Sequence, residues 1–360
     1  MRAQLARDFE RFRDGSLPPD FPKYIREAYG LDLTARYLGV TVPHPIGKGS
    51  GQLSLNATQL DADAAAGLAY VVLKTVIAED EGGGQSMAAW AIHETHMTVE
   101  KRRGWTVTWK GRGWDRTLHD YLQLLRHGRE LGMLVVPSVK YHLPRLDEPF
   151  RLTEYAHTTR ALVDAWGTPP LLLEVDFSPT LAGDPLASEQ EQILRWIREV
   201  PRLVRRLADA RIALKLMNAR FDDDFQVAMV EAAKEADAVV AFNRLFDAEK
   251  GVAYGGWDLS DRNVRVLDAF RRSPIRTYRP CLVGTGNICS GSMIMEYAQR
   301  GCESVQIHTM FQLPLEEYPA TAGSRTQRVL HFLVFDPKDG LISCMLDGGY
   351  RRFLDATRKD

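Results

Sequence analysis

Short runs of apolar residues recur along the chain from residue 45 onward, and most are continuous rather than alternating with polar residues. Continuous runs of this length are typical of parallel strands that are covered on both faces. The pattern predicts strands over residues 45–47, 69–74, 133–139, 171–177, 212–217, 238–242, 281–284 and 304–308. Helical periodicity follows between them over residues 117–131, 189–210, 224–235, 260–272 and 291–300.

The alternation of these strands with helices predicts an α/β fold, a single (β/α)8 barrel over residues 41–360. An open doubly wound sheet is the competing architecture, but no Gly-x-Gly-x-x-Gly turn follows an early strand. Two insertions, residues 77–115 and 244–258, follow the second and sixth strands. We expect them to be loops beside the functional site, because barrel enzymes assemble their sites at the carboxyl ends of strands.

The first forty residues depart from this rhythm. Residues 4–13 have an amphipathic helical pattern, which the sequence GSLPPDFP then breaks. We expect residues 1–40 to form an extension that packs on the barrel. The opening segment lacks the apolar region of a secretory signal, and the longest apolar runs are about half the length that crosses a bilayer. These features predict a cytoplasmic protein without a membrane partner.

Charge and cysteine content exclude several classes of function. Lys and Arg number 46 against 47 Asp and Glu, a net charge of −1, which argues against a broad surface for nucleic acid. The four cysteines form no Cys-x-x-Cys pair, so neither a metal cluster nor a disulfide framework is predicted. His93, Glu94 and His96 do not form the His-Glu-x-x-His motif, and we assign them to a loop without metal.

Two lysines lie within or at the end of apolar runs. Lys74 ends the second predicted strand, and Lys215 lies inside the fifth, in the sequence ALKLM. A lysine in such a run pays a desolvation cost unless it meets an anion or a hydrogen-bonding ligand. Two of them at strand ends of one barrel favour a ligand site over a structural ion pair.

The last two strands carry the elements of a phosphate site. GTGNI, residues 284–288, follows the seventh strand and precedes a helix for which Ser290 or Ser292 is the candidate cap. The eighth strand ends at His308 and Thr309. Loops at this place in a barrel, with backbone N–H groups at a helix N-terminus, commonly bind phosphate. The acidic run 222–224 stands just before a helix and is interpreted as its cap.

The order of the motifs HPIGKGSG, VVLKT, LLLEVDFSPT, ALKLM, VVAFNR, YGGWDL, LVGTGNICSG and SVQIHTMF resembles that of the FMN-dependent dihydroorotate dehydrogenases. The likeness spans residues 32–311, nearly the whole chain. It implies a flavin across the carboxyl end of the barrel, with Lys215 near its N1/O2 edge. A buried cation there would stabilise the anionic reduced flavin. The flavin-binding residues that the resemblance implies are Gly49, Ser50, Lys74, Thr75, Asp176, Lys215, Asn243, Gly255, Gly256, Gly286, Asn287, His308 and Thr309.

The chain departs from the family at the fourth strand. The family sequence Asn-x-Ser-Cys/Ser-Pro-Asn, whose Cys or Ser is the general base, is one residue shorter here, over residues 176–180. Strand alternation puts Glu174, Asp176 and Ser178 on one face, which aligns Asp176 with the family's Asn and deletes the base. Alignment on Ser-Pro instead makes Ser178 the base. Both alignments stay open, and Ser178 with Lys74 are the candidate catalytic residues.

The departures also affect the substrate. Thr108, Trp114 and Thr180 stand where the family has asparagines that bind the pyrimidine, and only Asn243 remains. Losing those amides would cost several kcal/mol of recognition, so the substrate is not expected to be dihydroorotate. Lys and Arg side chains neutralise and orient carboxylates, and they suggest a small anionic substrate. The predicted substrate-binding residues are Thr108, Lys110, Arg112, Thr180 and Asn243.

The combined prediction is an FMN-dependent oxidoreductase that acts on a CH–CH bond of a small molecule. The resembled enzymes are often dimers, which makes a homodimer possible for this chain. Two alternatives remain: a lyase or aldolase that forms a Schiff base on Lys215 or Lys74 with a phosphorylated substrate, and a barrel that binds flavin without catalysis.

Overall fold

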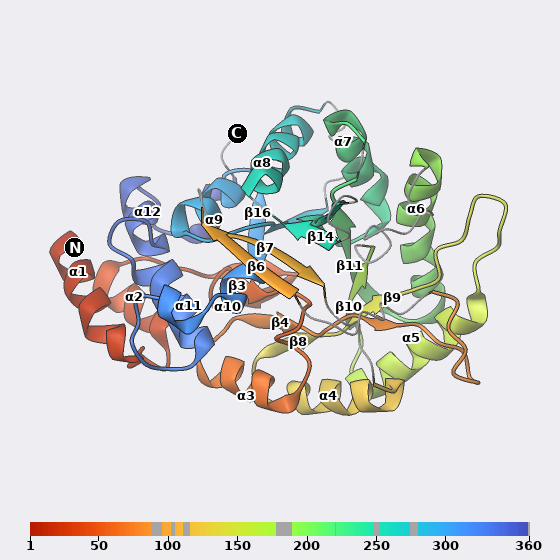
Figure 1. The fold of residues 1–360 in the computed structure, drawn as a ribbon, viewed down its shortest axis with the longest axis horizontal. Coiled ribbons are helices and arrows are strands. Elements are labelled where there is room, and N and C mark those ends of the chain that lie inside the picture. Colours follow the sequence, from red (N-terminus) through yellow and green to blue (C-terminus); the bar gives the residue numbers. More distant parts are fainter. Residues whose placement is uncertain are drawn as a thin grey trace.

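The computed structural model describes residues 1–87, 96–101, 105–110, 116–177, 189–219, 221–247, 252–255, 257–273 and 280–358. Its centre is a curled sheet of ten parallel strands, with helices packed around it (Figure 1). The strands lie in the order β5 (Val76–Ile77), β9 (Ser138–Lys140), β10 (Leu171–Asp176), β11 (Ala210–Met217), β12 (Ala238–Asn243), β15 (Cys281–Thr285), β16 (Cys302–Ile307), β3 (Ile46–Lys48), β4 (Tyr70–Val72) and β8 (Leu134–Val136).

Each strand that the apolar runs predict is present in this sheet, and the α/β class with a parallel sheet is confirmed. The run 133–139 forms two short strands, β8 and β9, separated by Pro137, which has no N–H to donate. β4 and β5 are likewise two short strands, separated by residues 73–75. The strands are buried because both faces are covered: all six residues of β10 are buried.

The predicted helices are also present, and their caps explain where they begin. Asp222 accepts a hydrogen bond from the Phe225 amide at the start of α7, as the acidic run predicts. Ser290, not Ser292, caps α9 through the Met293 amide. The outer helices are α3 (Ala57–Ala65), α4 (Leu118–Glu130), α5 (Leu152–Trp166), α6 (Gln190–Leu207), α7 (Asp223–Ala232), α8 (Trp257–Arg272), α9 (Gly291–Ala298), α11 (Arg325–Phe335) and α12 (Leu341–Asp347), with short α10 (Thr309–Gln312) and α13 (Phe353–Ala356).

The N-terminal segment packs against the C-terminal helices. It contains α1 (Arg2–Arg11), α2 (Phe21–Tyr29) and the antiparallel strands β1 (Ala35–Tyr37) and β2 (Val40–Val42). The Phe9 ring stacks on His331 of α11 with centroids 4.4 Å apart, and the Phe9 carbonyl lies 2.8 Å from His331 Nε2. Phe12 packs edge-on against Phe335 of the same helix.

The two insertions, expected to be loops, contain strands that pair with each other. β6 (His96–Lys101), β7 (Trp105–Lys110), β14 (Val252–Gly255) and β13 (Leu245–Asp247) form a four-stranded antiparallel sheet. In this sheet Thr108 is opposite Thr98 on one side and Tyr254 on the other. β7 lies against α10, which places the small sheet at the carboxyl end of β16, and Figure 1 shows it crossing the middle of the view.

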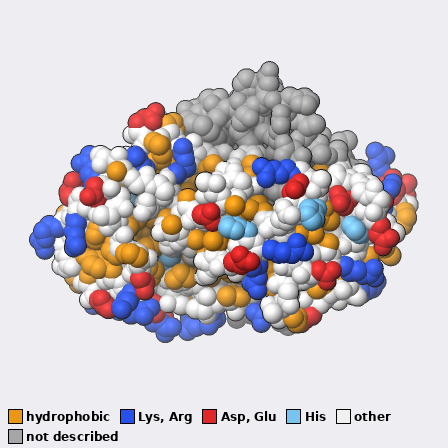
Figure 2. Space-filling model, turned by 90° about the horizontal axis from the view of Figure 1, so that it is seen from below, with side chains coloured by type: hydrophobic (Ala, Val, Ile, Leu, Met, Phe, Trp, Pro, Cys, Tyr) orange, Lys and Arg blue, Asp and Glu red, His pale blue; other side chains and the backbone are white. Residues whose placement is uncertain are grey.

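The surface in Figure 2 carries acidic and basic side chains of both signs, interspersed with hydrophobic ones. Such mixing agrees with the near-zero net charge of the chain. No helix in the described ranges has the length and apolar character needed to cross a membrane.

A buried ion pair ties the first strand of the sheet to two helices. Lys48 of β3 has its Nζ 2.5 and 2.7 Å from the Asp63 carboxylate oxygens on α3, and Thr326 of α11 donates to the same carboxylate. Burial lowers the pKa of Lys48 and raises that of Asp63, and the attraction between the two charges opposes both effects. Removing one partner therefore leaves a buried charge without compensation.

We expect Lys48→Met to lower the free energy of unfolding by about 3–5 kcal/mol, measured by urea denaturation. The double variant Lys48→Met/Asp63→Leu should recover part of this loss, because it removes both buried charges. Asp61→Asn on the same helix is the matched control: the Asp61 side chain is 54% exposed, and its loss should cost less than about 0.5 kcal/mol. A Lys48→Met variant as stable as this control would contradict the prediction.

Candidate functional site

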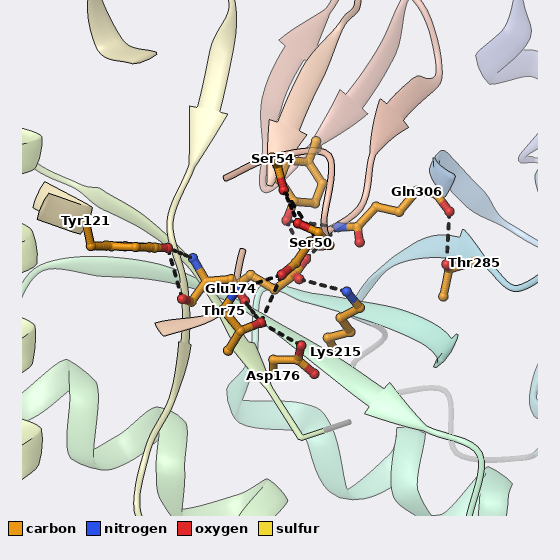
Figure 3. Close-up of polar contacts among 12 residues, drawn as sticks. Ser50, Ser54, Thr75, Tyr121, Glu174, Asp176, Lys215, Thr285 and Gln306 are labelled. Atoms are coloured by element: carbon orange, nitrogen blue, oxygen red, sulfur yellow. Dashed lines mark hydrogen bonds and ion pairs between the residues drawn. The ribbon is translucent and has the colours of Figure 1, made fainter. Parts of the chain in front are cut away.

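Polar side chains from distant parts of the chain meet at the carboxyl edge of the parallel sheet. Ser50 follows β3, Thr75 lies between β4 and β5, Asp176 ends β10 and Lys215 lies in β11 (Figure 3). Parallel strands present their carboxyl ends at one edge, where barrel-type enzymes bind substrates. We call the set of Ser50, Lys74, Thr75, Asp176, Lys215, Arg244 and His308 the polar cluster.

The Thr75 hydroxyl is the centre of the hydrogen bonding in this cluster. It donates to Asp176 Oδ2 at 2.8 Å and lies 2.9 Å from Ser50 Oγ and 3.0 Å from Ser138 Oγ. The Ser50 hydroxyl oxygen also accepts from the Thr75 amide at 2.9 Å. These contacts join the loop after β3 to the first residue of β9 and the last residue of β10, and Figure 3 shows Ser50, Thr75 and Asp176 among them. Thr75 therefore holds the Asp176 carboxylate in a fixed orientation.

Lys215 of the polar cluster is paired with a carboxylate inside the sheet. Its Nζ lies 3.6 Å from Glu174 Oε1, and both side chains are buried. The other oxygen, Oε2, accepts from Gln306 Nε2 at 2.5 Å and from the Tyr37 hydroxyl at 3.1 Å. Burial raises the pKa of Glu174, and the charge of Lys215 opposes that rise. Strand alternation predicts Glu174 on the same face as Asp176, but no role was predicted for it.

Lys74 and Arg244 add two positive charges to the cluster. Burial, followed by repulsion from Arg244, lowers the pKa of Lys74 to about 8. Burial likewise lowers the pKa of Arg244 to about 10, while Asp176 opposes the shift. Arg244 was not predicted, although it lies two residues after the predicted strand 238–242, in VVAFNR, and Lys74 was identified by its place at a strand end.

His308 is a neutral member of the cluster. Burial and the charges of Arg244 and Lys215 lower its pKa well below the usual value. Its Nε2 accepts from the Gln52 amide at 3.3 Å, and its buried Nδ1 has no hydrogen-bond partner among the described residues. A Cβ on Gly51 would lie 1.7 Å from His308 Nε2, so only glycine fits beneath this ring. Gly51 was not predicted, although GSG marks the turn.

The predicted phosphate turn has a backbone conformation suited to binding an anion. The first amides of the following helix α9, however, already have partners within the protein. Gly286 has a φ of +109°, where a Cβ would come within 2.4 Å of Asn263 Nδ2, and Asn287 has a φ of +46°. A turn whose successive N–H groups point to one side can form a concave anion site. The first amides of α9 have partners within the protein: Gly291 and Ser292 donate to Asp339, and Met293 donates to Ser290.

The other predicted residues fall into three sets. Gly49, Asn243 and Thr309 lie at the same carboxyl edge, after β3, at the end of β12 and after β16. Thr108, Lys110 and Gly255 belong to the small antiparallel sheet. Four predicted residues lie outside the described residues: Ser178, Thr180, Arg112 and Gly256.

A cavity of about 550 Å³ opens at the opposite, amino end of the strands, next to β2, β4 and β8. Its charged lining residues already have roles in the fold. Asp20 caps α2 through the Lys23 amide, and the Arg129 guanidinium lies 3.9 Å from the Trp166 ring centroid. The candidate chemistry therefore lies at the carboxyl edge.

Neither the models of known protein families nor the curated proteins include a match to this chain. Within the described ranges, no group of three or more His, Cys, Asp and Glu side chains is placed to hold a metal ion. His93 and Glu94 fall outside those ranges.

We expect Thr75→Val to lower the free energy of unfolding by about 1–3 kcal/mol, because it removes the donor to a buried carboxylate and two further polar contacts. Thr75→Ser keeps the hydroxyl and should recover most of this loss. Urea denaturation of the two variants measures the difference. Equal stability of Thr75→Val and Thr75→Ser would show that the hydroxyl does not support the cluster.

Proposed function

We propose that this protein is an FMN-dependent oxidoreductase, similar to the dihydroorotate dehydrogenases, built on a closed (β/α)8 barrel. Closure of the barrel is supported by the strands at the two ends of the sheet order. These strands come from the same two stretches of chain, residues 70–77 and 134–140. β5 pairs with β9 at one end and β4 pairs with β8 at the other. Between them, the Leu73 amide donates to the Val136 carbonyl at 2.9 Å. β4–β5 and β8–β9 then act as two neighbouring strands of one barrel.

The observation that carries the proposal is the convergence of Ser50, Thr75, Asp176 and Lys215 at one edge of the sheet (Figure 3). These residues are far apart in the sequence, and each comes from a different motif of the ordered set that resembles the family. A set of unrelated apolar strands would have no reason to place a hydrogen-bonded serine, threonine and aspartate next to a lysine that lies opposite the aspartate on the neighbouring strand.

The residues present fit FMN in three respects. Lys215 supplies a buried positive charge suited to the pyrimidine edge of a flavin. The Gly286–Asn287 turn offers N–H groups to a phosphate, in place of the first turn of α9. The buried Nδ1 of His308 has no hydrogen-bond partner in the part of the chain that the structure describes. FMN, when bound, accepts or donates hydride at N5.

The protein's own side chains would orient the substrate and move the accompanying proton. In this proposal Ser178 exchanges the proton at the carbon next to the one that exchanges hydride. Lys74 holds a negatively charged group of the substrate, which is a small molecule other than dihydroorotate. Thr75 keeps the Asp176 carboxylate in place through its 2.8 Å hydrogen bond.

The direct test is a visible absorption spectrum of the purified protein, with identification of any ligand released on denaturation. We expect oxidised flavin bands and FMN in the supernatant. A Lys215→Met/Glu174→Gln variant, which removes both charges of the buried pair, should still bind FMN but with a lower reduction potential, because the cation that stabilises the reduced flavin is absent. A colourless protein that also fails to bind added FMN would overturn the proposal.

One observation favours a second candidate, a Schiff-base lyase or aldolase. The pKa of Lys74 is about 8, so a useful fraction of this amine is neutral and nucleophilic near neutral pH. Borohydride treatment in the presence of dihydroxyacetone phosphate would then add the reduced adduct mass to the peptide containing Lys74. The Lys74→Met variant is the control. No adduct with this compound or with other phosphorylated carbonyl compounds would exclude the second candidate.

A further inference from the structure

The turn after β15 is anchored by a side chain of α8. Asn263 of that helix is buried, and its Nδ2 donates to the Thr285 carbonyl at 2.9 Å and to the Phe242 carbonyl at 3.0 Å. The last residues that pair between β12 and β15 are Ala241 and Gly284, so both carbonyls lie just beyond the ladder. The Asn263 amide therefore joins the two strands at the point where their own pairing ends.

Asn263 and Gly286 fit closely against each other. Gly286 has a φ of +109°, and a Cβ there would lie 2.4 Å from Asn263 Nδ2. The Asn263 Oδ1 accepts from Asn218 Nδ2 at 2.9 Å, which fixes the orientation of the amide. Because the amide is held on both of its polar atoms, only glycine allows the turn to lie directly against it.

A tyrosine of α9 contacts the same turn. The Tyr297 hydroxyl donates to the Thr285 carbonyl at 2.8 Å and lies 3.4 Å from the Gly286 carbonyl oxygen. The peptide bonds of the turn are trans, and in a planar trans peptide the N–H points opposite to the C=O. Since both carbonyls point toward Tyr297, the N–H groups of Gly286 and Asn287 point away from α8 and α9.

The exposure of the turn agrees with this direction. Thr285 and Asn287 are buried, whereas Gly286 between them is partly exposed. Within the described part of the chain, the Gly286 N–H donates no hydrogen bond. An exposed N–H group whose neighbouring carbonyls are held on the other side is suited to an anion.

We infer that Asn263 and Tyr297 are positioning residues of the phosphate site, and that through the turn they make the protein select FMN over riboflavin. The inference rests on the proposed function, because it concerns the phosphate of the same ligand. Neither side chain contacts the phosphate: each holds a carbonyl, and the backbone then presents its N–H groups in a fixed direction. The direction matters because a hydrogen bond weakens steeply as it departs from linearity.

The test is a fluorescence titration of the purified full chain, freed of any bound flavin, with FMN and with riboflavin, which differ only in the phosphate. We expect the wild-type protein to bind FMN at least about tenfold more tightly. Asn263→Leu has a side chain of similar size without a donor, so it should lower the affinity for FMN about tenfold and leave that for riboflavin unchanged. Equal binding of both flavins by the wild type, or an equal loss of both in the variant, would overturn the inference.

Tyr297→Phe is the second variant and keeps the test informative where Asn263→Leu does not fold. It removes one hydroxyl and should lower the affinity for FMN about threefold, again without a change for riboflavin. Tyr155→Phe is the matched control, because the buried Tyr155 of α5 also donates to a backbone carbonyl, that of His142, at 2.8 Å. Both tyrosine variants should lose similar stability in urea. The same ratio of FMN to riboflavin affinity in both variants would contradict the assignment.

A measurement that does not depend on flavin separates the two proposals. With isotope-labelled glycine, the NMR resonance of the Gly286 amide should shift when inorganic phosphate is added to the wild-type protein, and less in Tyr297→Phe. Such a shift in a protein that binds neither flavin would retain this inference for another phosphorylated ligand and reject the flavin proposal. FMN binding with unchanged selectivity in both variants would reject this inference alone. No phosphate shift and no flavin binding would reject both.

Discussion

The ion pair between Glu174 and Lys215 is the constraint on which the rest of the site depends. Both side chains project into the interior of the parallel sheet, where an isolated charge costs several kcal/mol. The two charges compensate each other across the 3.6 Å between Lys215 Nζ and Glu174 Oε1. Tyr37 and Gln306 donate hydrogen bonds to the second oxygen of the carboxylate. β10 and β11 must therefore keep the register in which Asp176 lies opposite Lys215. That register places a lysine and a carboxylate at the carboxyl edge.

The other charged members of the polar cluster are also wholly or partly removed from solvent. Asp176 is held by the Thr75 hydroxyl, and Lys74 and Arg244 both lie where burial disfavours their charged forms. In a structural ion pair such as that of Lys48 with Asp63, the two charged groups are in direct contact. In the polar cluster, Lys74 and Arg244 both act electrostatically on the region of Asp176, and the perturbed pKa values of the two cations are of the kind found at functional sites.

The fold could be predicted to a large extent because buried parallel strands leave a simple signal. The runs ending at Lys74, Phe177 and Met217 are nearly all apolar, and each corresponds to a strand. The small antiparallel sheet was missed because its two hairpins come from separate insertions, and pairing between β7 and β14 has no local signature.

For the candidate site, the sequence predicted several of the residues but not the contacts between them. The ordered motifs identified Ser50, Thr75 and Lys215, but the contacts among them join residues that are distant in sequence, and no periodicity reveals these. Arg244 was missed because its electrostatic partner Asp176 comes from another strand. The His308 ring over Gly51 could not be expected either, since it depends on the close approach of two loops.

The measurement that tests the central claim most directly is a crystal structure of the protein grown with FMN. The account predicts the flavin at the carboxyl edge, with Lys215 against its pyrimidine edge and its phosphate on the N–H groups of Gly286 and Asn287. Flavin bound elsewhere, for example in the cavity at the amino end of β4 and β8, or a carboxyl edge that stays without flavin at saturating FMN, would contradict it.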